Sequence, residues 1–320
     1  MARTASADLP AIVLHVPVAC VIGETCWIQN HLDHDPGPGA EDYRHGSLTY
    51  DGHKGTDFRV PTQREMRIGV AVLAAADGIV KAIRDGMADG PASGEVDETR
   101  HGERLGGNDV LIDHGQGWES QYGHLRLGSV RVVVGQQLRA GEPLGMIGQS
   151  GLAQFPHVHF ELRYNGQPVD PFDARDPEQP EAPGRALWSS EAGQVWHYHH
   201  AGELSSGFAN VIPDAALVGD PPAGCCDRRD RALLFWVNFF GVRRGDRETI
   251  RLLGPTGQVL AEQQDIARNH QARTIRYVGR PRPSSEPSWP GGVYTGEFFL
   301  EREGFAEPLI HITRRLTLSP

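Results

Sequence analysis

The sequence has no long hydrophobic run and no internal repeat. None of its 320 residues falls in a stretch that approaches the ~20 apolar residues of a membrane-spanning helix. The most apolar N-terminal stretch, residues 11–23, is interrupted by His15 and Pro17, so it predicts a strand rather than a signal peptide. We therefore expect no transmembrane segment.

Basic residues are too few for a surface that binds nucleic acid. The chain has 31 Lys and Arg against 41 Asp and Glu, a net charge of −10, and residues 1–172 alone hold 14 basic against 22 acidic residues. Such a segment repels phosphate groups and has no basic stripe to displace counterions from a nucleic-acid backbone. We therefore expect no nucleic-acid partner.

Four cysteines in a chain of this length are too few for a disulfide scaffold. Cys20 and Cys26 could close a small loop around Gly23 in an oxidising compartment, and Cys225 stands next to Cys226. Reduced thiols fit the same pattern, so the sequence leaves the state of both pairs open.

The composition favours a mainly β protein. The 39 Gly and 23 Pro imply frequent turns and few long helices, and 320 residues exceed what one hydrophobic core usually serves. Short β-branched runs between glycines predict an antiparallel sheet, and residues 84–108, which lack a hydrophobic period, predict a functional surface loop. The expected strands cover residues 70–73, 78–83, 110–113, 130–134, 144–147 and 157–164.

Turn and linker signals divide the chain into four parts. Residues 1–44 predict an N-terminal extension that packs on an antiparallel β domain over residues 45–172. Residues 173–190, rich in proline and charge, predict a linker. Residues 191–320 carry regular turn signals between strand-like runs, which predict a small β-sandwich of the immunoglobulin type.

Two histidines project from one predicted strand. Residues 157–163 (HVHFELR) alternate strictly, so the apolar side chains share the core face and His157 and His159 share the other face. On their own, two such histidines would be explained as solvated or hydrogen-bonded side chains. Their significance depends on what other residues reach the same face.

A second motif supplies a carboxylate and another imidazole. Residues 52–58 (GHKGTDF) place His53 and Asp57 four apart, and the flanking glycines favour a turn at a strand edge over a helix. Zinc binds neutral imidazole nitrogen and carboxylate oxygen, and a catalytic zinc site keeps three protein ligands and one open position. His53, Asp57 and one histidine of the HVH motif make such a set.

Further histidines have less specific patterns. His124, in the string YGHL over residues 122–125, ends a predicted hairpin arm, and a water activated by a metal also needs a base or a stabiliser beside it. His114 is expected in a structural or outer role. The WHYHH tract over residues 196–200 is expected on a strand of the second domain, at its surface or at an interface. His31, Asp33, His34 and Asp35 could add a second ion or brace the mouth of the site, but the sequence favours a polar loop that makes its own turns.

With its three motifs in this order, the segment over residues 45–172 resembles the lysostaphin/LytM-type zinc endopeptidases. The family's H-x-x-x-D motif corresponds to residues 53–57, its Tyr-x-His-Leu motif to residues 122–125, and its H-x-H motif to residues 157–159. The glycine-punctuated stretch over residues 134–151 also resembles the strands that precede H-x-H in that family.

The resemblance implies a role for each site residue. His53, Asp57 and His159 would ligate Zn²⁺, while His124 and His157 would be the catalytic histidines beside the water that the metal activates. The sequence does not decide which of the two histidines takes the proton and which stabilises the oxyanion. No organic cofactor is implied.

The resemblance also implies a substrate and a location. The family hydrolyses peptide bonds in peptidoglycan stems or cross-links, so we expect peptidoglycan peptides as the partner and a periplasmic or secreted protein, although no signal peptide is present in this sequence. One alternative is a non-catalytic cell-wall-binding or amidase-activating LytM-like protein, and another is a zinc hydrolase for a different amide. The presence of all three ligands and both catalytic histidines disfavours the non-catalytic alternative.

Overall fold

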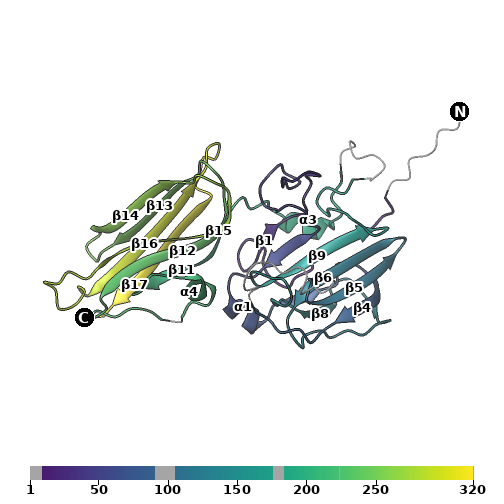
Figure 1. Ribbon diagram of the computed structural model, residues 1–320, viewed down its shortest axis with the longest axis horizontal. Helices are drawn as coiled ribbons and strands as arrows, with labels where there is room; N and C mark the ends of the chain where they lie inside the picture. The colour runs from purple at the N-terminus through teal and green to yellow at the C-terminus, as the bar shows by residue number, and fades with distance from the viewer. Residues whose placement is uncertain (1–8, 91–104, 176–183, 223, 320) are drawn as a thin grey trace. The chain divides into compact units, whose positions relative to one another are not determined.

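The computed structural model describes residues 9–90, 105–175, 184–222 and 224–319, which form two compact units (Figure 1). The first contains the residues up to Tyr198 apart from the short segment Pro61–Arg64, and the second begins at His199. Both are built from antiparallel strands with few short helices, which confirms the prediction of a mainly β, antiparallel protein. Among the described residues, no helix is long and apolar enough to cross a membrane.

Eight strands form the main sheet of the first unit, in the order β1-β2-β9-β6-β5-β4-β7, with β10 paired to β9 (Figure 1). Strands β3 and β8 form a separate small sheet. The elements are β1 (Trp27–Asn30), β2 (Thr56–Arg59), α1 (Gln63–Ile68), β3 (Ala71–Leu73), β4 (Gly78–Arg84), β5 (Asn108–Gly115), β6 (Trp118–Leu125), β7 (Gln137–Leu138), β8 (Pro143–Met146), β9 (His157–Tyr164), β10 (Gln167–Pro168) and α3 (Ser190–Val195).

The alternation along β9 builds the core of this unit. Val158, Phe160 and Leu162 are almost fully buried, and Phe160 contacts Tyr122 of β6 and Phe58 of β2 with ring centroids 5.4 and 6.4 Å apart. Burying such side chains stabilises the sheet by about 1.5–3 kcal/mol each. Because side chains alternate along a strand, this packing sends the intervening residues of β9 to the opposite face.

Both ends of the first unit's sequence join this core. β1 pairs with β2, and Leu14 bridges to Trp188, so residues on either side of the central strands share one hydrophobic cluster. The linker expected over residues 173–190 lies partly outside the described residues, and its described ends pair through Ala174 and Arg185. The four-part division of the chain stays a prediction.

Two local expectations were wrong. Residues 130–134 form no strand, because Val132 is buried while Val133 and Val134 face solvent ahead of a turn at Gly135. The tract over residues 196–200 is not a surface strand of the second unit. Its first residue, Trp196, packs in the first unit with ring centroids 4.7 Å from Trp188 and 5.8 Å from Phe58. The surface loop expected over residues 84–108 lies mostly outside the described residues.

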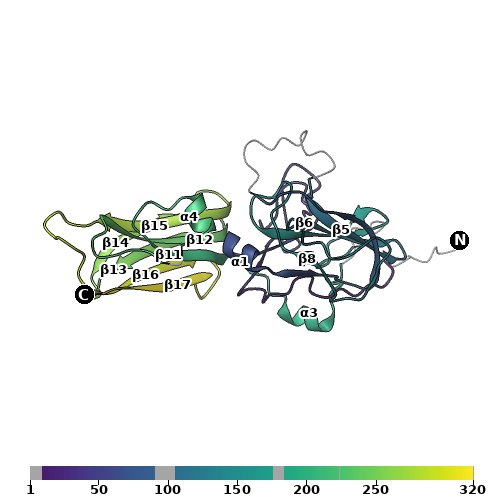
Figure 2. The ribbon, with the colours of Figure 1, turned by 90° about the horizontal axis from the view of Figure 1, so that it is seen from below.

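The second unit consists of two antiparallel sheets in the orders β11-β12-β15 and β14-β13-β16-β17 (Figure 2). Both sheets contribute to one core, where Phe239 of β12 and Phe298 of β16 lie 4.6 Å apart between ring centroids. Its likeness to an immunoglobulin domain stays a prediction. The elements are β11 (Gly202–Ala209), α4 (Ala215–Gly219), β12 (Ala232–Val242), β13 (Arg247–Leu253), β14 (Val259–Ile266), β15 (Gln271–Pro281), β16 (Gly292–Glu301) and β17 (Ile310–Leu318).

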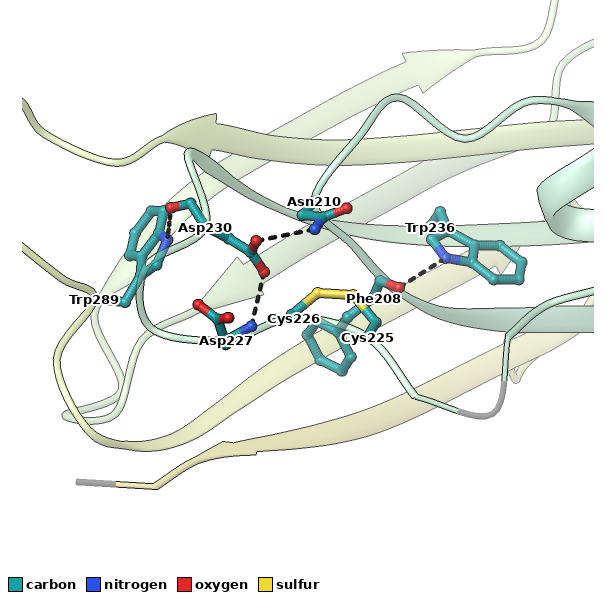
Figure 3. The surroundings of a disulfide bond; sticks show 8 residues. All are labelled: Phe208, Asn210, Cys225, Cys226, Asp227, Asp230, Trp236 and Trp289. Atoms are coloured by element: carbon teal, nitrogen blue, oxygen red, sulfur yellow. Dashed lines mark hydrogen bonds between the residues drawn. A yellow bond between two sulfur atoms is a disulfide. The ribbon is translucent and has the colours of Figure 1, made fainter.

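All four cysteines are paired, which decides the question that the sequence left open. Cys20 bonds to Cys26 in the first unit, and the adjacent Cys225 and Cys226 bond to each other in the second. Figure 3 shows the second bond beside Phe208. The carboxylate of Asp230 stabilises this loop, because it accepts hydrogen bonds from the backbone amide of Asp227 at 2.7 Å and from the side-chain amide of Asn210 at 3.0 Å.

Candidate metal centre

Adjacent strands β2 and β9 bring three candidate ligands together. Asp57 and His159 are directly opposite in the antiparallel register, and His53 precedes β2 in a turn. Asp57 Oδ1 lies 3.0 Å from His159 Nδ1 and 3.2 Å from His53 Nε2, and these two nitrogens are 3.2 Å apart. One ligand atom from each residue therefore falls within a sphere that a single cation can fill.

Gly55 allows this close approach. A Cβ atom at this position would lie 2.8 Å from the imidazole of His159 and 2.5 Å from the carbonyl oxygen of Phe160. Any other residue would therefore push β2 away from β9. The glycine between His53 and Asp57 is therefore required by packing.

The donor set fits a zinc ion. It offers two imidazole nitrogens and one carboxylate oxygen, which is the ligand set of many catalytic zinc sites. The side chains of His53 and Asp57 are 1% and 3% exposed, whereas His159 is 19% exposed, so the cluster is closed behind and open on one side. His53 Nδ1 donates to the His31 carbonyl at 2.6 Å, which leaves the lone pair on Nε2, the atom that faces the other two ligands.

Without a bound cation, Asp57 favours its charged carboxylate and His159 favours a bound proton. Burial would raise the pKa of the Asp57 carboxyl, but the neighbouring His53 and His157 and the hydrogen bond from His159 hold that pKa well below its ordinary value. Burial would lower the pKa of His159, but Asp57 and Glu161 outweigh it and raise the pKa to about 9. A divalent cation would replace this proton, because metal ligands bind deprotonated.

The two candidate catalytic histidines lie beside the ligands. The rings of His124 and His157 are 4.6 Å apart between centroids, and His157 Nε2 lies 3.5 Å from Asp57 Oδ1. His124 Nδ1 donates to the Ser150 carbonyl and His157 Nδ1 to the Phe155 carbonyl, both at 2.8 Å. Each neutral ring therefore keeps its Nε2 as a proton acceptor.

Burial keeps both of these imidazoles neutral. It lowers the pKa of His124 to about 3, helped by the neighbouring His157 and His159, and it also lowers the pKa of His157 although Asp57 opposes it. His124 adopts a left-handed backbone with φ of 61°, uncommon for a residue other than glycine and enriched at functional sites. Its backbone amide donates to the Gly106 carbonyl at 2.6 Å, which helps hold that conformation.

His114 takes no part in the cluster. Its Nδ1 donates to the Asp77 carbonyl and its Nε2 lies 2.7 Å from the Ser120 hydroxyl, which agrees with the structural role expected for it. Glu161 lies 3.8 Å from His159 Nε2 and accepts a hydrogen bond from Arg163 at 2.7 Å. It therefore acts on the ligand's charge and not as a ligand.

Two contacts to the cluster come from Asn30, which no sequence pattern suggests, and from His31, in the loop that could brace the site. The amide of Asn30 donates to Asp57 Oδ2 at 2.8 Å, and the carbonyl of His31 accepts from His53. Asn30 ends β1 and His31 follows it, more than twenty positions before the motif. No spacing rule joins them to it, because only the β1–β2 pairing brings them there.

An antiparallel sheet that carries a largely buried His-Asp-His set beside two further imidazoles fits a domain of the LytM metallopeptidase type. Residues 51–171 match peptidase family M23, and this segment is a domain of that family.

Curated relatives match over this segment. The chain is 30% identical over 135 residues to the peptidoglycan DD-endopeptidase ShyA of Vibrio cholerae, an alignment that covers 42% of this chain and 26% of ShyA. It is 37% identical over 110 residues to the murein hydrolase activator EnvC of Escherichia coli, with 34% and 24% covered. The chain therefore spans about a quarter of the length of these relatives.

Among solved structures, the chain matches the catalytic domain of a mutant of the prophage-encoded M23 protein EnpA from Enterococcus faecalis. The TM-score is 0.33 and the identity 23%, over 53% of this chain and 96% of the EnpA domain.

Proposed function

We propose that this protein is a zinc-dependent endopeptidase that hydrolyses peptide bonds in peptidoglycan stems or cross-links, in the periplasm or outside the cell. The observation that carries the proposal is the convergence of His53, Asp57 and His159 beside two neutral imidazoles. The M23 match and the 30% identity to a peptidoglycan DD-endopeptidase support the substrate class.

His53, Asp57 and His159 are the proposed zinc ligands. A bound Zn²⁺ would polarise the scissile carbonyl and lower the pKa of a water molecule toward ~7. The hydrogen bond from His53 Nδ1 to the backbone turns Nε2 toward the ligand cluster, and the greater exposure of His159 leaves one side open to a substrate. These residues would therefore hold the ion and leave room for a substrate beside it.

His157 and His124 are the proposed proton carriers. Each holds its Nδ1 proton on a backbone carbonyl, so each can accept a proton from the attacking water at Nε2 and then donate it to the leaving amine. His157 Nε2 faces Asp57, whose negative charge would stabilise the imidazolium that forms. Their burial excludes bulk water, which strengthens these interactions.

The division of the chain is part of the proposal. We assign the peptidase domain to residues 45–172 and an immunoglobulin-like sandwich to residues 191–320, joined by a linker over residues 173–190. The single core shared by the two sheets of the second unit supports the sandwich. Its proposed role is to hold the enzyme on wall polymer or on a partner.

The experiment is digestion of purified muropeptides, with the products identified by mass spectrometry. Wild-type protein loaded with zinc should cleave a stem or cross-link peptide, and His157→Ala should abolish cleavage. His270→Ala, an exposed histidine of the second unit, is the matched control and should cleave like wild type. Zinc-loaded protein that cuts no muropeptide would instead support a wall-binding or activating protein, the class to which EnvC belongs by name.

A further inference from the structure

We propose that Asn30 is a positioning residue of the metal centre, which holds the carboxylate of Asp57 in the orientation that a metal requires. The proposal rests on the metal-binding role proposed above for His53, Asp57 and His159. It assigns a task in that site to β1, which lies before the residues that match family M23.

The two oxygens of Asp57 have different partners. Oδ2 accepts a hydrogen bond from the side-chain amide of Asn30 at 2.8 Å. Oδ1 faces the other two ligands, His53 Nε2 at 3.2 Å and His159 Nδ1 at 3.0 Å. Rotation of the carboxylate would break the bond to Asn30, so that bond selects Oδ1 as the oxygen offered to a cation.

An irregularity in the β1–β2 ladder places Asn30 there. Trp27 pairs with Arg59 and Ile28 with Phe58, so a regular ladder would set Gln29 opposite Asp57. The register instead shifts after Ile28, and Asn30 stands opposite Asp57. Such bulges re-aim side chains and are frequent beside active sites. Here the bulge brings an amide donor to the buried oxygen.

The next residue supports a second ligand from the same side. The His31 carbonyl accepts from His53 Nδ1 at 2.6 Å and also from the Thr49 hydroxyl at 2.8 Å. The His31 amide donates to the Leu48 carbonyl at 2.7 Å, which fixes the position of this backbone. The consecutive residues Asn30 and His31 thus each hold one proposed ligand, Asp57 and His53, by a hydrogen bond.

Burial makes the Asn30 bond consequential. Asn30 and Asp57 are both buried, so an Asp57 oxygen that lost its donor would have no water to replace it. Outer hydrogen-bond partners of metal ligands typically account for 10- to 100-fold in metal affinity. A purely structural amide would instead lower the stability of the fold and leave the metal affinity of the folded protein unchanged.

The test measures zinc affinity and not turnover. The apo forms of wild type, Asn30→Leu and Asn238→Leu are titrated with Zn²⁺ in competition with a chromophoric chelator, and the absorption spectrum of the Co²⁺-substituted proteins is recorded. Leucine has a similar volume and no donor. Asn238 is the matched control, since it is a buried amide of the second unit that donates to Ser205 at 3.1 Å and accepts from Arg273 at 2.8 Å.

We expect Asn30→Leu to weaken zinc binding by about 10- to 100-fold and to alter the Co²⁺ spectrum, and Asn238→Leu to change neither. Zinc affinity and a Co²⁺ spectrum like those of wild type in folded Asn30→Leu would overturn the proposal and leave the metal centre intact. If Asn30→Leu does not fold, Asn30→Ala is judged by the same criterion. Wild-type protein without zinc affinity would overturn the proposed function together with this inference.

Discussion

Replacing His159 or His157 by alanine should separate metal binding from catalysis, if the proposed roles of the two residues hold. The two histidines lie two positions apart on β9, but only His159 contributes an atom to the ligand group. Zinc sites with four protein ligands bind with apparent free energies on the order of 10–16 kcal/mol. Loss of one of three ligands should therefore cost on the order of 3 kcal/mol, about 100-fold in zinc affinity.

His157→Ala should behave differently. Its Nδ1 is engaged with the Phe155 carbonyl, and its Nε2 lies 3.5 Å from Asp57 without entering the ligand group. Zinc affinity should stay near that of wild type, while turnover should fall by about 100- to 10,000-fold because a positioned acid or base is lost.

The assay measures metal content and turnover on the same preparations. Each variant is reconstituted with zinc and desalted. Its metal is measured by mass spectrometry, its cleavage of muropeptides is followed by chromatography, and its thermal midpoint is recorded to verify folding. We expect little zinc and no cleavage in His159→Ala, and a full complement of zinc without cleavage in His157→Ala. Equal metal loss in both folded variants would refute the assignment of ligand and base.

Two further predictions follow from contacts around the centre. In the metal-free protein Asp57 and Glu161 raise the pKa of His159 to about 9 against the effect of burial. Zinc binding at pH 7 should therefore release about one proton, and this release should shrink as the pH approaches 9. Calorimetry in buffers of different ionisation enthalpy would measure the number of protons released. A release that does not change with pH would contradict this. Tyr122→Phe removes the buried hydroxyl that accepts from the Ala75 amide at 2.7 Å, so it should lower the free energy of unfolding in urea by about 1–3 kcal/mol while zinc stoichiometry stays unchanged.

The centre of the site could be predicted from the sequence because its residues obey local rules. Alternation along residues 157–163 puts both histidines on one face, and the four-residue spacing of His53 and Asp57 across Gly55 suits a turn into a strand. The structure brings these residues together. The burial that keeps His124 neutral is not visible in a local pattern, since it comes from segments distant in the sequence.

The parts that sequence reasoning missed depend on pairing between distant segments. The apolar run over residues 130–134 has the composition of a strand. It forms none, because the chain turns at Gly135 and Val133 faces solvent, and this context outweighs the β propensity of the valines. Trp196 lies in a tract rich in histidine that suggests a polar surface, yet it packs against Trp188 and the first core. Asn30 carries no motif at all, because its role arises from a one-residue bulge in the β1–β2 ladder.

The physical boundary of the metal centre therefore lies before the boundary of the family match. All four residues of β2 are buried, including Asp57, and both edges of this strand are paired. β9 covers one edge and β1 covers the other. Without Asn30 and His31, the outer oxygen of Asp57 and the Nδ1 proton of His53 would both lose their partners. The residues that match family M23 supply the proposed ligands, and these two residues before them, the last of β1 and its successor, keep two of those ligands in position.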